Sequence, residues 1–144
     1  MRIRLVAVPD RHYLTLVARA YADTPGKPAA PAVRCNFVTL YKPRIGLKVQ
    51  AWFVRRTPGK VPELRIGIAF DAHRAEANAA AGDAFFSRFE NELRALGAER
   101  WESDSDHDRR YATPLPVPPA GADLTELTHH AAALAHRYVE LIRE

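Results

Sequence analysis

The densest group of side chains that could do chemistry lies in one short polar segment in the last third of the chain. It combines hard oxygen ligands with one imidazole, and consists of Glu102, Asp104, Asp106, His107 and Asp108. An EF-hand calcium loop beginning at Glu102 would need glycine at its sixth position and glutamate at its twelfth, where this chain has His107 and Thr113. We therefore expect a solvated turn between two strands, with a weak cation site as the alternative.

Other catalytic and metal-binding patterns are incomplete in this sequence. A restriction-type nuclease core needs an acidic residue, any residue and then a lysine, to hold Mg²⁺ and polarise water, and no such triplet occurs. The histidines near the C-terminus, His129, His130 and His136, lack the four-residue spacing of a helical zinc pair. The single cysteine, Cys35, is expected in a strand as a small core residue. We expect no catalytic residue, no metal and no cofactor.

Basic and aromatic residues gather instead on a predicted β-meander. Residues 33–41 and 47–56 are rich in β-branched and aromatic types, and the Pro- and Gly-containing segment 42–46 predicts a hairpin turn between them. Alternation in the second strand places its basic and aromatic residues on the face opposite the core. A cationic surface with an embedded tryptophan would neutralise phosphates and stack on bases. The predicted nucleic-acid-binding residues are Lys42, Arg44, Lys48, Trp52, Arg56 and Arg65.

The elements that must position these residues follow from periodicity. A third strand is predicted at Glu63–Phe70, a helix within residues 71–96, and two short strands at 98–102 and 110–117. The prolines after residue 113 predict that the last of these strands lies at an edge or ends near Leu115. Residues 2–8 read as a first strand. Residues 12–22 fit both a strand and a helix, and the strand is preferred.

The final helix begins with a capping-box-like pair, Asp123 and Glu126, and carries one narrow apolar stripe for packing on the sheet or on a partner. Together the elements predict an α+β fold: a mainly antiparallel sheet of five or six strands with two amphipathic helices packed on one face. Residues 1–144 are predicted to form a single domain with a Pro-rich loop at 24–32.

Composition narrows the class of protein further. A chain of 144 residues with 47% hydrophobic and 26% charged residues suits a globular domain, and its apolar runs are too short for a membrane span or signal peptide. We expect a cytoplasmic protein. The net charge of +4 is uneven: residues 1–65 carry 13 basic and three acidic residues, whereas residues 66–144 carry eight and 14. This asymmetry predicts one surface that attracts anions and another that docks something basic, unless the chain folds both parts together.

The order of these elements and several short matches resemble a bacterial domain of unknown function that accompanies restriction-endonuclease-like nuclease domains. The matching residues run from Arg11 to the C-terminus and include residues 11–15, Phe37, residues 46–49, residues 76–78, Phe85, Phe86, Trp101, Glu102 and residues 108–110. We expect the chain to differ from that family by standing alone without a nuclease domain and by a Pro-rich insert at 24–31. The resemblance implies an accessory module in DNA defence or processing, with no catalytic residues to carry over.

The preferred interpretation is a non-catalytic, nucleic-acid-associated accessory protein that binds DNA or RNA phosphates through its basic meander. The alternative is a protein-interaction subunit or inhibitor, within a nuclease complex or as an oligomer, that uses its acidic part or its last helix. A metal-dependent nuclease is the third. Binding by several basic groups would weaken steeply with added salt, whereas docking through an apolar helix stripe would barely respond.

Overall fold

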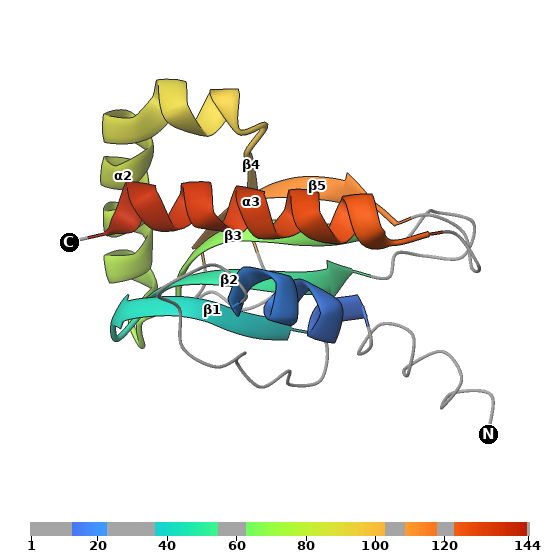
Figure 1. Cartoon of the computed structure of the whole chain (residues 1–144). Helices are drawn as coiled ribbons and strands as arrows, with labels where there is room; N and C mark the ends of the chain where they lie inside the picture. The colour runs from blue at the N-terminus through green and yellow to red at the C-terminus, as the bar shows by residue number, and fades with distance from the viewer. Residues whose placement is uncertain (1–12, 23–36, 55–62, 103–108, 118–122, 144) are drawn as a thin grey trace.

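The computed structural model describes residues 13–22, 37–54, 63–102, 109–117 and 123–143. A helix at residues 13–22 is followed by β1 (Phe37–Arg44), β2 (Leu47–Val54), β3 (Glu63–Phe70), α2 (Ala75–Ala95), β4 (Glu99–Glu102), β5 (Arg109–Pro116) and α3 (Thr125–Ile142) (Figure 1). The predicted α+β class with a five-stranded antiparallel sheet is confirmed. The predicted strand at 2–8, the loop at 24–32 and Cys35 lie outside the described residues.

The strands form one sheet in the order β1-β2-β3-β5-β4, and every neighbouring pair is antiparallel. Of the two alternatives for the proline-containing strand, the edge position is wrong, because β5 is held between β3 and β4, whereas the strand does end near Leu115, at Pro116. The short strand β4 pairs only with Arg109 to Ala112 of β5. The half of β5 that carries Pro114 and Pro116 therefore has a single neighbour, β3, and tolerates residues that cannot donate a ladder hydrogen bond.

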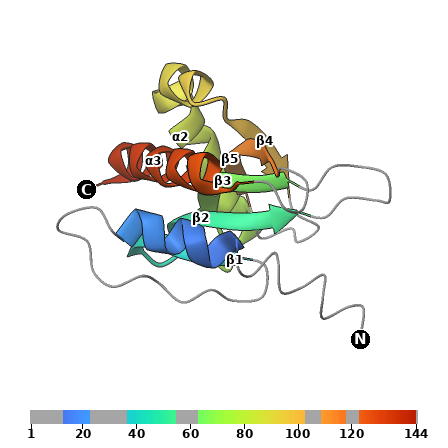
Figure 2. The same ribbon diagram turned by 45° about the vertical axis from the view of Figure 1, so that its right-hand side comes forward.

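The helices described all pack on one face of this sheet. Figures 1 and 2 show the helix at residues 13–22 and α3 side by side over the sheet, while α2 crosses one end of it. The side chains of Phe85 and Phe86 on α2 contact Phe70 of β3 and Tyr111 of β5. Cross-strand pairing puts Tyr111 beside Ile68, on the same face as the core under α3. The predicted two helices on one face are present, together with a third at residues 13–22.

That third helix replaces the strand predicted for residues 12–22. Its buried residues, Tyr13, Leu14, Val17, Ala18 and Tyr21, recur at spacings of three and four. Tyr21 also stacks on His136 of α3, with ring centroids 4.4 Å apart. The same residues alternate well enough to fit a strand, and packing against β1 and α3 decides in favour of the helix.

The apolar side of α3 is broader than the predicted narrow stripe. Besides the expected Ala131, Leu134 and Tyr138, the core contains Ala132, Ala135, Val139 and Ile142. The two alternatives for this stripe were the sheet and a partner protein, and the structure places it on the sheet and on the helix at residues 13–22. No helix in the described ranges is both long and apolar enough to cross a membrane.

Candidate nucleic-acid interface

The hairpin between β1 and β2 ends in a two-residue turn, Ile45 and Gly46, rather than in the five-residue turn predicted for residues 42–46. Gly46 has a φ of +83°, which a side chain would strain. Its carbonyl accepts a hydrogen bond from the backbone N–H of Asp71 at 3.0 Å, and a Cβ at Gly46 would lie 3.1 Å from that of Ala72. The turn is therefore held against the segment that leads from β3 into α2.

Exposed basic residues lie on both of these segments. Lys42 and Arg44 lie at the end of β1, and His73 and Arg74 follow Ala72 immediately before α2. Ile45 lies at the tip of the turn with 82% of its surface exposed. We call this group, Lys42, Arg44, Ile45, His73 and Arg74, the basic end.

The carboxylate of Asp71, whose backbone N–H bonds to this turn, is already neutralised. Asp71 Oδ2 lies 2.6 Å from Lys48 Nζ, and both side chains are mostly buried. Glu76, in the first turn of α2, is exposed and occupies the position where an acidic residue stabilises the helix N-terminus. The basic end consequently presents a positive surface in spite of the acidic residues that follow it in the sequence.

The face of the sheet opposite the helices carries a layer of two tryptophans and two arginines. Cross-strand pairing sets Trp52 beside Arg65 and Trp101 beside Arg110. The side chains then cross over: the Arg110 guanidinium carbon lies 4.9 Å from the Trp52 ring centre, and that of Arg65 lies 3.1 Å from the Trp101 ring centre. Such cation–π contacts gain strength where water is excluded. We call these four residues the Trp–Arg layer.

Small residues and one glutamine make this layer possible. Gly67, Ala69 and Ala112 lie on the same face as the Trp–Arg layer, and their small size leaves room on that face for the arginine and tryptophan side chains. The amide oxygen of Gln50 accepts a hydrogen bond from Arg110 Nη1 at 2.8 Å, while its amide nitrogen donates to Thr39 Oγ1 at 3.1 Å. These bonds tie β5 across β3 to the β1–β2 hairpin.

The structure brings together only part of the predicted binding surface. Trp52 and Arg65 share a face as expected, but they are 8% and 7% exposed, so the prediction that they form an open surface is wrong. Arg65 Nη2 also lies 3.4 Å from the Glu63 carboxylate, and Lys48 is engaged by Asp71. Arg56 lies outside the described residues. Lys42 and Arg44 remain exposed.

His73 and Arg74 were not among the predicted residues. They follow the third predicted strand, and antiparallel pairing of β3 with β2 returns the end of β3 to the start of β2. The predicted meander was enough to place residues 73 and 74 near the β1–β2 turn, because the end of a third antiparallel strand must lie beside the first hairpin turn. The arginine–tryptophan crossing in the Trp–Arg layer had no comparable signal, since Trp101 and Arg110 come from distant strands.

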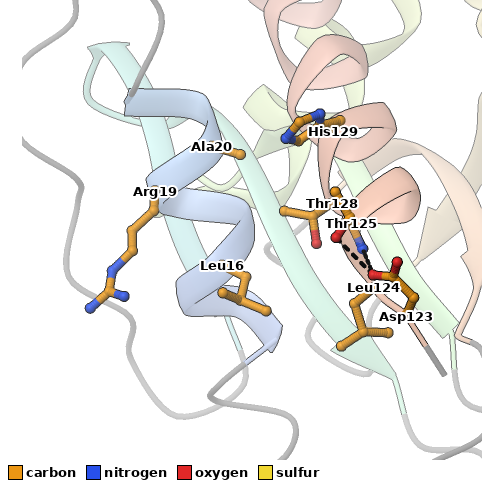
Figure 3. Close-up of a pocket in the computed structure, with 8 residues that line it drawn as sticks. All are labelled: Leu16, Arg19, Ala20, Asp123, Leu124, Thr125, Thr128 and His129. Carbon is orange, nitrogen blue, oxygen red and sulfur yellow. Dashed lines mark hydrogen bonds between the residues drawn. The ribbon is translucent and has the colours of Figure 1, made fainter. Parts of the chain in front are cut away.

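A pocket of about 490 Å³ lies between the helix at residues 13–22 and the start of α3. Figure 3 shows Leu16 and Ala20 directed toward α3, His129 directed back toward the first helix, and Arg19 directed away. Thr128 is only 7% exposed, and its hydroxyl finds no hydrogen-bond partner within the described part of the chain. A molecule in this pocket would have to be partly apolar and to offer Thr128 one hydrogen-bonding group.

Asp123 lies beside this pocket, one residue before the N-cap residue Leu124 of α3. Its Oδ1 accepts hydrogen bonds from the backbone N–H of Thr125 at 2.9 Å and from the Thr125 hydroxyl at 2.7 Å. These bonds favour the charged carboxylate and lower the pKa of Asp123. The predicted capping box is not formed, because the N-cap residue is Leu124 and no side chain caps the helix.

The shifted tyrosines are far from the protonation states that catalysis near neutral pH would use. Burial raises the pKa of Tyr138 to about 12, partly offset by its hydrogen bond with Thr113, and it raises the pKa of Tyr13, Tyr21 and Tyr111 as well. All four phenols stay protonated at neutral pH, and the hydroxyls of Tyr111 and Tyr138 form hydrogen bonds with the Gly82 carbonyl and Thr113.

The predicted acidic turn at residues 103–108 lies outside the described residues, so the structure does not test whether this turn binds a cation. Within the ranges that are described, no group of three or more His, Cys, Asp or Glu side chains is placed to hold a metal ion. No protein-family model, curated protein or solved structure matched the chain. The resemblance to the nuclease-associated domain accordingly stays a prediction.

Proposed function

We propose that this protein is a non-catalytic, nucleic-acid-associated accessory protein that contacts phosphates through its basic end. The observation that carries the proposal is the contact of Gly46 with Asp71 and Ala72, which brings the turn after Lys42 and Arg44 against the segment that precedes His73 and Arg74. Exposed cations grouped in this way bind a phosphate backbone by displacing its condensed counterions. The setting in bacterial DNA defence rests on the family resemblance alone.

The acidic part of the chain gives less support to the alternative, a protein-interaction subunit or inhibitor. Several of its carboxylates form ion pairs within the protein, including Asp71 with Lys48, Asp83 with Arg109, Glu90 with Arg94 and Glu140 with Arg143. The apolar side of α3 is used in the protein's own core. The acidic residues and the apolar side of α3, which the alternative would use to bind a partner, are thus partly engaged in contacts within the protein.

Salt dependence provides the test. If Lys42, Arg44 and Arg74 each neutralise one phosphate of a DNA duplex, affinity should fall about 40-fold between roughly 50 and 200 mM salt. Fluorescence anisotropy with a labelled 20-base-pair DNA duplex, and with an RNA duplex of the same sequence, measures this slope. Affinity that does not change over this range contradicts the proposal and favours docking to a protein.

A matched pair of double variants separates the basic end from general charge. Lys42→Glu with Arg44→Glu should abolish most of the salt dependence, because each lost phosphate contact removes about 0.9 from the slope of log K against log salt. Arg19→Glu with Arg137→Glu changes the net charge equally, but at exposed positions on the helical layer. Equal loss of binding in both double variants would refute an assignment to the basic end.

The nuclease alternative is checked in the same samples. Incubation of the labelled duplex with Mg²⁺, with and without EDTA, should leave it intact if the protein is non-catalytic. Cleavage that EDTA prevents would instead favour the metal-dependent nuclease, and Asp104→Ala would show whether the acidic turn supplies it.

A further inference from the structure

The tip of the basic end carries an apolar side chain that the fold does not use. Ile45 is 82% exposed, and among the described residues it is the one large hydrophobic side chain that stands in solvent. It directly follows Arg44 in the sequence, and the next residue, Gly46, contacts Asp71 and Ala72, which precede His73 and Arg74. An apolar tip beside the exposed basic residues Lys42 and Arg44 suits an anionic partner with an apolar interior.

The turn that carries Ile45 is braced rather than loose. Gly46 is bonded to the Asp71 backbone and packs on Ala72, and the Asp71 side chain is in turn fixed by Lys48 of β2. A side chain on such a turn keeps its position when it is pressed into a partner. Ile45 therefore has the properties of a wedge: it is apolar, narrow, and supported from behind.

A nucleic-acid duplex fits this arrangement better than a lipid surface does. Proteins that bind the minor groove insert single apolar side chains between base steps while neighbouring cations hold the phosphates. One isoleucine buries too little apolar surface to hold a protein on a bilayer, since even a myristoyl chain binds only marginally. The charge around Ile45 would suit either surface, and the area of the apolar tip favours the duplex.

We propose that Ile45 inserts between adjacent base pairs from the minor groove and partly unstacks them, while Lys42 and Arg44 bind the flanking phosphates. This inference rests on the proposed function, because the wedge can act only if the basic end binds a duplex. It adds that binding deforms the duplex at one base step, which phosphate contacts alone would not do.

The test uses a DNA duplex with 2-aminopurine at successive positions, whose fluorescence rises when the base is unstacked. Wild type and Ile45→Leu should raise the fluorescence at one step. Ile45→Ser should keep the salt slope, because the cations are unchanged, yet lose the rise and bind about tenfold more weakly. Since Ile45 is exposed, the urea midpoint of Ile45→Ser should match that of wild type.

The outcomes distinguish the two proposals. Salt-dependent binding with no rise in fluorescence, or an equal rise with Ile45→Ser, overturns the wedge and leaves the basic end as a phosphate site. A wild-type protein that does not bind the duplex overturns both. Loss of binding by Ile45→Ser to vesicles containing anionic lipid, with no binding to the duplex, would assign the tip to a membrane surface instead.

Discussion

Two threonines under α3, half-buried Thr113 and buried Thr128, have opposite hydrogen-bonding environments, so the same substitution at each tests the packing there. Thr113 of β5 donates a hydrogen bond to the Leu96 carbonyl at 2.7 Å and shares another, also 2.7 Å, with the hydroxyl of the fully buried Tyr138. Thr128 of α3 is more deeply buried, at 7% exposure, but its hydroxyl has no partner in the described part of the chain. Replacement by valine keeps the shape of the side chain and removes the hydroxyl.

The expected effects differ in sign. Thr113→Val leaves the Leu96 carbonyl and the Tyr138 hydroxyl without this partner, at a cost of about 3 kcal/mol in the free energy of unfolding. Thr128→Val removes an unsatisfied polar group and should stabilise the protein by up to about 1 kcal/mol. Urea denaturation followed by circular dichroism measures both, and for Thr113→Val the midpoint should fall by roughly 1.5–2 M.

The test depends on the difference between the urea midpoints of the two variants. A change in one midpoint alone would not separate the lost hydrogen bonds from other effects of replacing threonine by valine. Equal midpoints for the two variants, or a larger loss for Thr128→Val, would refute this account of the hydrogen bonding under α3. A loss at Thr128 would further indicate that its hydroxyl has a partner in solution, and that the pocket beside it is not free.

Three further predictions concern stability. The pKa of Tyr138 is raised to about 12, so the folded state keeps a proton that the unfolded chain releases near pH 10; stability should be intact below pH 10 and fall between about pH 10 and 12, and Tyr138→Phe should reduce this slope in urea midpoints measured against pH. Gly67→Ala would push a Cβ into the Tyr111 carbonyl oxygen and the Ala112 backbone, and should cost about 3 kcal/mol or more, seen as a loss of soluble protein or a lower Tm; an unchanged Tm would contradict the close approach of β3 and β5. Arg65→Met keeps the apolar stem but removes the charge over Trp101, and should cost about 1–2 kcal/mol by urea denaturation, whereas a neutral effect would mean that the contact stabilises little.

The buried structural role of Arg65 and Lys48 also determines how binding experiments must be designed. Reversal of charge at these two residues would follow naturally from the predicted basic face. Because Lys48 is paired with Asp71 and Arg65 lies in the Trp–Arg layer, such a variant would lose stability and its failure to bind would be uninformative. Lys42 and Arg44 are the residues at which a charge can be reversed without disturbing the core.

Much of the fold could be predicted because local pattern and tertiary environment agree. β3 falls on its predicted residues, since four alternating apolar side chains ending at Phe70 all enter the core. α3 was equally clear from its three-and-four spacing. The helix at residues 13–22 was missed because its short apolar pattern satisfies two periods, and only contact with other elements distinguishes them.

The candidate site was less predictable for a physical reason. Alternation tells which face of a strand a residue occupies, and it placed Trp52 and Arg65 together correctly. It does not tell whether that face is covered, which depends on how far long side chains such as Arg110 reach from other strands. The charge asymmetry along the sequence was misleading in the same way, because the dividing point at residue 65 falls inside β3 and both parts build one sheet.

The position of β5 between β3 and β4 has a consequence for the order in which the chain can assemble. β1, β2 and β3 form consecutive hairpins with contacts that are local in sequence, so this meander can pair early. The second edge of β3 is filled only when β5 arrives, after all of α2 and β4 have been synthesised. Until then the meander exposes an open, apolar strand edge to other chains. A chain cut after β4 should therefore self-associate, and the sheet cannot be divided into an independent N-terminal half.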